Sequence, residues 1–85
     1  MTYYVIKRDG RKVNFDIKKI ENAINQSVRE LNTEVNTALI QSEVTNKIKS
    51  STVYEISVEQ IQDFIEETLL ELDLESVKQV YASYR

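Results

Sequence analysis

Residues 4–16, YVIKRDGRKVNFD, decide how this chain begins to fold. Apolar and polar residues alternate on both sides of Asp9 and Gly10, and Asp-Gly between two such runs is the strongest short-range signal of a β-hairpin. A two-residue loop at Asp9 and Gly10 would pair Lys7 with Lys12. The hairpin face that lies on the core would then carry four apolar side chains, namely Tyr4, Ile6, Val13 and Phe15.

Positive charge is concentrated in the same part of the chain. The 85 residues have a formal net charge of −3, yet residues 1–19 carry six cations and two anions, and residues 20–85 carry five cations and twelve anions. A nucleic-acid-binding protein usually spreads Lys and Arg over a whole face, so the acidic remainder argues against a nucleic-acid partner. An anion between Lys7 and Lys12 would relieve their repulsion. The simpler alternative is that both ammonium groups point into solvent at a sheet edge.

The composition narrows the possible functions. The chain has no Cys and no His, which excludes disulfides and every Ser-His, Cys-His or His-metal site within it. We find no nucleophile paired with a base, so we expect no catalysis by this chain. No apolar run reaches the ~18 residues of a membrane span, and no signal peptide is evident. We therefore expect a cytoplasmic protein without a membrane partner.

Four helices are predicted after the hairpin, and local capping signals mark two of their starts. Asp16 is the expected N-cap of the first helix, and Phe15 and Ile20 form a hydrophobic staple around it. Ser57 is the expected N-cap of the third helix, with Gln60 completing a capping box.

The other two helices are less sharply marked. The second helix is expected to begin between Thr33 and Thr37 and to end near residues 50–51, before a short extended link. The last is expected to begin at Asp73, with Leu72 and Val77 as a staple.

Apolar residues at helical spacing predict the core. The expected inward positions are Ile17, Ile20, Ile24, Val28, Leu31, Ile40, Val44, Ile48, Ile61, Phe64, Ile65, Thr68, Leu69, Leu72, Val77, Val80, Tyr81 and Tyr84. The short connections favour antiparallel neighbours. The predicted fold is therefore α+β and mostly α. It is a single domain, residues 1–85, in which an N-terminal β-hairpin lid (1–16) lies over a four-helix bundle (17–85).

The positive charge near the hairpin also predicts a small anionic ligand. Lys7, Arg8, Lys12 and Lys19 would converge on phosphates, and helix N-termini would offer backbone N–H groups. The alternative is a helical protein-interaction module, because amphipathic helices are common to all bundles.

Three segments then resemble one family when they are taken together. VIKRDGRKVNFDIKKIENAI (5–24), ISVEQIQDFIEETLLEL (56–72) and SVKQVYASYR (76–85) are similar to the ATP-cone, the allosteric nucleotide-binding domain of many ribonucleotide reductases. The resemblance implies a hairpin lid with ATP or dATP, together with Mg²⁺, held beneath it as an effector that is not consumed. ATP would activate and dATP would inhibit a parent reductase. The implied partners are the catalytic domain and the other subunits of that parent, most like the anaerobic ribonucleoside-triphosphate class, with an aerobic large subunit as the rival.

The resemblance also implies roles for particular residues. Val5, Lys7 and Arg8 on the hairpin match nucleotide contacts of the family, and Lys19 matches a lysine in its first helix. Asp16 lies where the family often reads adenine, although a plain N-cap explains it equally well. Ser57 and Gln62, at the start of the third helix, would face the phosphates.

Two positions keep a further alternative open. Val13 stands where some members have a base-reading glutamate, and Val58 where some have a phosphate-binding threonine. A degenerate cone that no longer binds nucleotide is the corresponding alternative.

Overall fold

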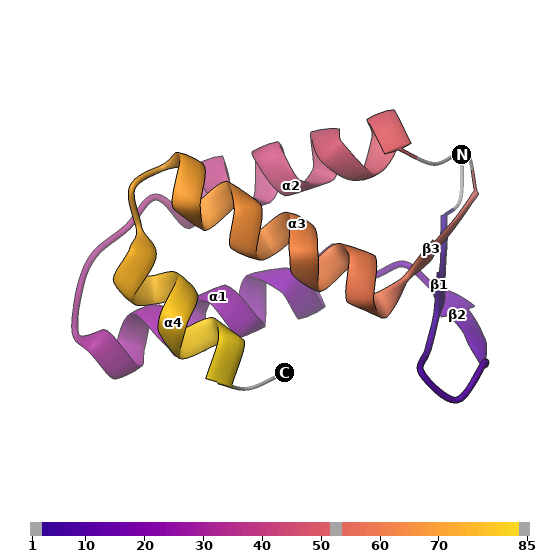
Figure 1. Cartoon of the computed structure of the whole chain (residues 1–85), viewed down its shortest axis with the longest axis horizontal. Helices are drawn as coiled ribbons and strands as arrows, with labels where there is room; N and C mark the ends of the chain where they lie inside the picture. The colour runs from indigo at the N-terminus through magenta and orange to yellow at the C-terminus, as the bar shows by residue number, and fades with distance from the viewer. Residues whose placement is uncertain (1–2, 52–53, 84–85) are drawn as a thin grey trace.

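The computed structural model describes residues 3–51 and 54–83, which form a small sheet and four helices (Figure 1). In chain order the elements are β1 (Tyr4–Ile6), β2 (Lys12–Asn14), α1 (Ile17–Leu31), α2 (Thr37–Ser51), β3 (Glu55–Ser57), α3 (Val58–Glu71) and α4 (Glu75–Ser83). The predicted α+β class, mostly α with an N-terminal hairpin, is confirmed.

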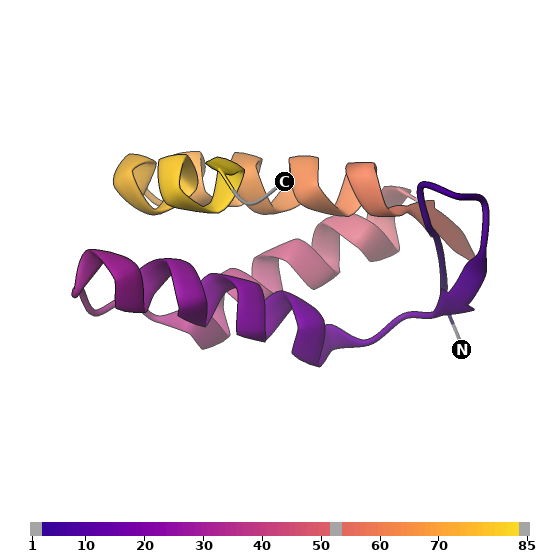
Figure 2. The ribbon, with the colours of Figure 1, turned by 90° about the horizontal axis from the view of Figure 1, so that it is seen from below.

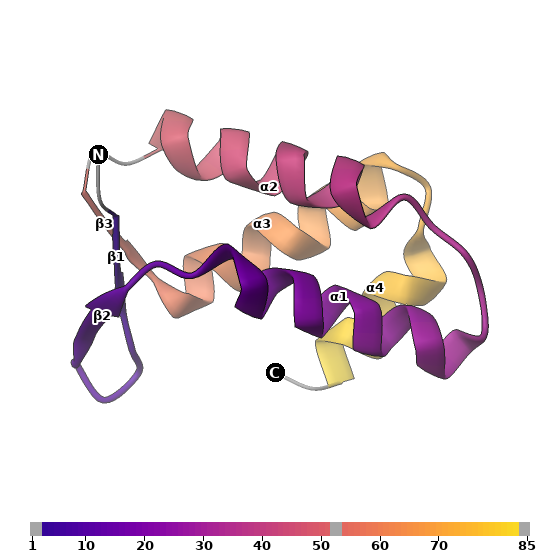
Figure 3. The same cartoon turned by 180° about the vertical axis from the view of Figure 1, so that it is seen from behind.

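The helices form a bundle in which successive members run in opposite directions. α1 packs against α2 and α4, and α3 packs against the same two helices. α1 and α3 begin at the end of the bundle where the sheet lies, and α2 and α4 begin at the far end (Figures 1 and 3). Seen from below, the sheet closes one end of the bundle (Figure 2). Two helix N-termini therefore face the sheet.

The core is aliphatic and follows the predicted stripes. Its buried members are Val5, Ile20, Ile24, Ile40, Val44, Ile48, Ile56, Ile61, Ile65, Leu69, Val77 and Tyr81. Two polar residues, Ser27 and Thr68, are fully buried, and their hydroxyls donate to the carbonyls of Ala23 at 3.1 Å and Phe64 at 2.8 Å. A hydroxyl bonded to the preceding turn is buried without an unsatisfied donor.

Some of the predicted inward positions lie elsewhere. Leu31 is 36% exposed at the end of α1. Val80 is only half-buried, and Tyr84 lies outside the described residues.

The predicted helix starts at Asp16 and Ser57 are confirmed. The Asp16 carboxylate accepts from the Lys18 backbone N–H at 3.0 Å. The Ser57 hydroxyl accepts from the Gln60 N–H at 3.1 Å, while Gln60 Oε1 accepts from the Ser57 N–H at 3.2 Å. α2 begins at Thr37, within the predicted range, and the Asn36 side chain accepts from the Leu39 N–H at 3.0 Å.

The predicted start of the last helix at Asp73 is wrong. Asp73 has a φ of 61° and belongs to the end of α3, where its N–H donates to Leu70 O at 3.0 Å and the Leu74 N–H donates to Leu69 O at 2.8 Å. This pair of bonds is the Schellman motif, whose left-handed residue is usually Gly. Asn32 ends α1 in the same way, with a φ of 50°. Because the chain has a single Gly, Asp and Asn occupy both left-handed positions.

The sheet has one strand more than the sequence pattern suggested. Its order is β2-β1-β3, with β3 parallel to β1 and Val5 paired with Ile56. The link before α3, expected to be merely extended, is thus a strand. It joins the hairpin directly to the N-terminus of α3.

The predicted hairpin register is wrong by one residue. The paired residues are Tyr4 with Asn14, Val5 with Val13 and Ile6 with Lys12. The Lys7 N–H donates to Arg11 O at 2.8 Å, and the Gly10 N–H donates to Lys7 O at 2.9 Å. The loop therefore has three residues and ends with Gly10 at a φ of 89°. This is the turn followed by a left-handed glycine bulge that Asp-Gly also permits.

The new register changes which side chains face the core. Val5 is buried and Val13 packs beside it, whereas Tyr4 and Ile6, both expected inside, are half-buried on the other face. A one-residue shift exchanges the faces of one strand relative to the other, because side chains alternate along a strand.

No helix among the described residues is long and apolar enough to cross a membrane.

Candidate functional site

A cavity of about 140 Å³ lies where the hairpin meets the first turns of α1 and α3. Its lining is drawn from the sheet, from both helix starts and from α4, and consists of Val5, Lys7, Val13, Asn14, Phe15, Asp16, Lys19, Ile20, Val58, Ile61, Gln62, Ile65 and Tyr81. Four segments distant in sequence therefore meet at this one place.

The lining combines an apolar wall with two cations. Val5, Ile20 and Ile61 are buried core residues that also border the cavity. Lys7 follows Val5 by two residues, directly after the end of β1, and lies on the same side of the hairpin as Val5. Lys19 comes from the first turn of α1, where the helix dipole disfavours a cation unless an anion is near. An apolar wall beside two ammonium groups suits a ligand with a flat ring and a negatively charged group.

Asp16 brings one carboxylate to this cavity. Its Oδ1 accepts from the Lys18 N–H, so that capping α1 engages one of its two oxygens. The Asp16 carboxylate is exposed and borders the cavity, and a carboxylate is a suitable acceptor for an amine of a ligand.

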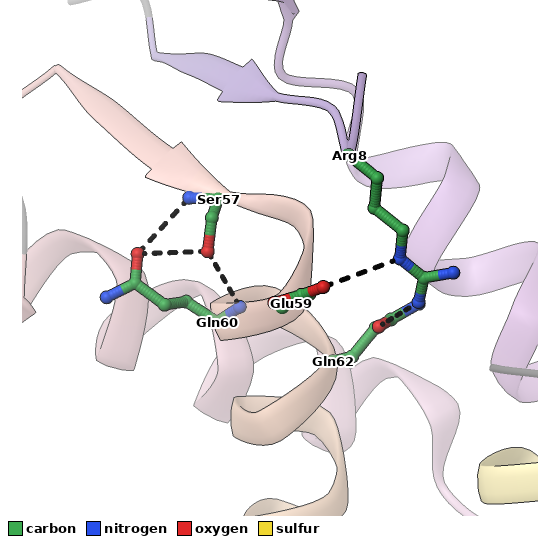
Figure 4. A network of polar contacts seen from close by, with 5 residues as sticks. All are labelled: Arg8, Ser57, Glu59, Gln60 and Gln62. Atoms are coloured by element: carbon green, nitrogen blue, oxygen red, sulfur yellow. Dashed lines mark hydrogen bonds and ion pairs between the residues drawn. The ribbon is translucent and has the colours of Figure 1, made fainter. Parts of the chain in front are cut away.

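Arg8 lies at the rim and connects the hairpin to α3 (Figure 4). Its Nη2 donates to Gln62 Oε1 at 3.1 Å, and its Nε lies 3.7 Å from Glu59 Oε1. Gln62 lines the cavity, so the guanidinium is bonded to a wall residue. Glu59 and Gln62 are three residues apart and share one face of α3.

Ser57 lies beside the cavity without lining it. Its hydroxyl is used in the capping box with Gln60 (Figure 4). Val58, one residue on, does line the cavity.

The structure places Lys12 on the opposite face of the hairpin from the cavity. Its Nζ lies 2.6 Å from Glu55 Oε1 and 4.7 Å from the centroid of the Tyr4 ring. The hydrogen bond to Glu55 raises the pKa of Lys12. The expected opposition of Lys7 and Lys12 is therefore not found, because the three-residue loop pairs Lys7 with Arg11.

Of the eight residues predicted from the sequence, five line the cavity, namely Val5, Lys7, Asp16, Lys19 and Gln62. Arg8 contacts one of them, and Ser57 and Lys12 are engaged elsewhere. The sequence reading missed the apolar wall, because Ile20, Ile61 and Tyr81 were assigned only to the core. It also missed Glu59, although its spacing from Gln62 was visible in the sequence.

A larger hollow of about 450 Å³ lies at the far end of the bundle. Its wall includes the carboxylates of Glu34, Asp73 and Glu75. Like charges there disfavour an anionic ligand, so the cavity at the sheet is the better candidate. Among residues 3–51 and 54–83, no group of three or more acidic side chains is placed to hold a metal ion.

Comparisons with known proteins point to one family. A family model described as the ATP cone domain matches residues 3–85. The chain is also similar to the anaerobic ribonucleoside-triphosphate reductase of Haemophilus influenzae, with 36% identity over 83 residues. That match covers 95% of this chain and spans only 12% of the length of the reductase.

Proposed function

The chain belongs to the ATP-cone family, the regulatory nucleotide-binding domains of ribonucleotide reductases, and we propose that it binds ATP or dATP as an allosteric effector of a parent reductase. The name of the curated relative favours the anaerobic class. Catalysis would reside in the rest of that parent, which we expect in the cytoplasm, and its catalytic domain and other subunits would be the partners of this one.

The cavity between the hairpin and the starts of α1 and α3 is the observation that carries the proposal. Its volume suits one planar base better than a whole nucleotide, since ligand pockets are typically ~300–1,000 Å³. We place adenine against Val5 and Ile61, with its amine toward Asp16. The phosphates then extend along the rim toward Lys7, Lys19 and Arg8, which supply charge-assisted hydrogen bonds.

The proposed site keeps six of the predicted residues, namely Val5, Lys7, Arg8, Asp16, Lys19 and Gln62. Lys12 is left out because it lies on the opposite face of the hairpin, where it pairs with Glu55, and Ser57 is left out because it does not line the cavity and caps α3.

Regulation follows from which elements the ligand would connect. A nucleotide in this cavity would contact the hairpin, α1 and α3 together, so that its binding energy would favour one arrangement of the sheet on the bundle. A ligand shifts an equilibrium only through its different affinities for two states. ATP and dATP differ by one ribose hydroxyl. For the two nucleotides to have opposite effects, that hydroxyl would have to change their relative affinities for two states of the parent reductase.

Calorimetric titration with ATP, dATP and GTP tests the proposal. The titrations are run at moderate salt with Mg²⁺, and are repeated with EDTA in place of the metal. Binding of the adenine nucleotides, with little heat from GTP, is the expected result. No heat and no thermal shift with any of the three would overturn the proposal and favour a degenerate cone or a helical interaction module.

A further inference from the structure

Two side chains of α3 engage Arg8. Its Nη2 bonds to Gln62 and its Nε, on the same edge of the guanidinium, faces Glu59, so the first two turns of α3 hold the tip of the hairpin (Figure 4). We call Arg8, Glu59 and Gln62 the rim latch. It is the polar side-chain link between the hairpin loop and α3 at the mouth of the cavity.

Glu59 has a less specific role as well. An acidic residue in the first turn of a helix stabilises that helix through its dipole. This role needs no contact with Arg8, and it predicts no effect on ligand binding.

The position of Glu59 has a consequence for an anionic ligand. The nucleotide phosphates and the Glu59 carboxylate are both hydrogen-bond acceptors. The Arg8 guanidinium has only N–H donors, so both acceptors seek the same groups. A phosphate that binds the Nε–Nη2 edge of Arg8, which can form two parallel hydrogen bonds with an anion, must therefore displace Glu59 from that edge.

We propose that Glu59 sets the affinity and phosphate dependence of the site, by competing with the nucleotide phosphates for Arg8. The inference rests on the proposed function. It names a regulating residue that lies outside the cavity lining.

The expected size of the effect is modest. The Arg8 and Glu59 side chains are 56% and 65% exposed, and their atoms are 3.7 Å apart. Exposed ion pairs are weak, so releasing Arg8 costs about two- to fivefold in affinity. A weak latch is suitable for this role, because a strong one would prevent the site from opening.

The test compares Glu59→Gln with the wild-type chain by titration with ATP, AMP and adenosine. The substitution removes the charged competitor and keeps the size of the side chain. We expect ATP to bind about two- to fivefold more tightly, AMP to gain less and adenosine to be unchanged. Glu34→Gln is the matched control, because it makes the same change of charge at the far end of the bundle.

The double variant Arg8→Ala/Glu59→Gln separates competition from simple repulsion. If Glu59 acts through Arg8, the substitution of Glu59 has no effect on ATP affinity once Arg8 is gone. If Glu59 merely repels phosphate, the gain persists in the Arg8→Ala background. Hydrogen exchange of residues 4–14 without ligand gives an independent measurement. The exchange should be faster in Glu59→Gln and in Arg8→Ala than in the wild-type chain.

The outcomes distinguish the two proposals. ATP affinity that is unchanged by Glu59→Gln, or a gain that is equal for adenosine or persists without Arg8, overturns the role of Glu59 and leaves the proposed function standing. No binding of ATP by the wild-type chain and by every variant overturns the proposed function and this inference with it.

Discussion

The two ends of this molecule are held together in different ways. The bundle is stabilised by aliphatic side chains such as Ile24, Ile40 and Leu69, which have no exposed surface. The sheet end consists of three-residue strands, and its side-chain ion pairs are exposed. Buried aliphatic area contributes far more to stability than exposed charge pairs do. The bundle is thus a rigid support, and the sheet end is the part that a ligand can rearrange.

The largest expected effect comes from breaking the bundle. Ile24→Ala removes a fully buried side chain from α1 and should lower the free energy of unfolding by about 2–5 kcal/mol. Urea denaturation followed by helical circular dichroism measures this. Leu70→Ala, at a position that is 50% exposed, is the control and should change stability little. Similar losses from both variants would contradict the division between core and surface.

The next largest effect separates the two hairpin lysines. Lys7→Ala should weaken ATP binding by about 1–3 kcal/mol, because a charge-assisted contact with phosphate is lost. Lys12→Ala is the matched control on the opposite face, and should leave the affinity essentially unchanged. Calorimetry measures both, with Lys78→Ala as a second surface control. Equal losses for Lys7 and Lys12 would contradict the placement of Lys7 alone at the nucleotide site.

A smaller effect on stability is expected at the far end of the bundle. Asp73→Gly should raise the free energy of unfolding by about 0.5–1 kcal/mol, because glycine adopts the left-handed conformation without strain. Asn32→Gly should gain less, since Asn tolerates this conformation better. Thermal or urea unfolding measures the gain. Nucleotide affinity should not change, and a change would mean that the two ends are coupled.

The smallest effect concerns the hairpin loop at acid pH. The Arg11 backbone N–H donates to Asp9 Oδ1 at 3.0 Å, and the Arg11 Nε donates to Oδ2 at 2.7 Å. These bonds lower the pKa of Asp9 below its usual 3.8. Because the pKa is lower in the folded state, the stabilisation is present above about pH 4 and is lost as the pH falls through the lowered value.

The hairpin loop should therefore loosen in acid. Hydrogen exchange of residues 7–11 should accelerate between pH 4 and pH 2 relative to Asp9→Asn, after correction for intrinsic rates. Equal pH dependence in the two chains would contradict a role for the Asp9 carboxylate.

The errors of the sequence reading all concern choices that local chemistry leaves open. Asp9 and Gly10 fit either a two-residue or a three-residue loop, and the register depends on which of the two lets Val5 reach the core. β3 pairs with β1 across more than fifty positions of sequence, so that no periodicity within a three-residue segment reveals it. Asp is a common residue at helix starts. Asp73 nevertheless lies at the end of α3, because two backbone hydrogen bonds form a Schellman motif there.

For the candidate site too, some features could be predicted from the sequence and others could not. The types of its polar residues were visible in the sequence, because four cations lie close together around one turn. Which of them share a cavity was not visible, since a shift of one residue moves Lys7 and Lys12 from one shared face to opposite faces of the hairpin. The link from Arg8 to Glu59 and Gln62 spans more than fifty positions, and only the packing of the hairpin on α3 brings these side chains together.

The sequence by itself determined the helices, the class of the fold and the concentration of charge. The N-caps at Asp16 and Ser57 and the apolar stripes act within a few residues, so that local patterns suffice to specify them. Only the tertiary structure decided the hairpin register, the third strand, the cavity and its rim. Each of these depends on how much buried area the whole chain gains, which is a property of contacts between distant residues.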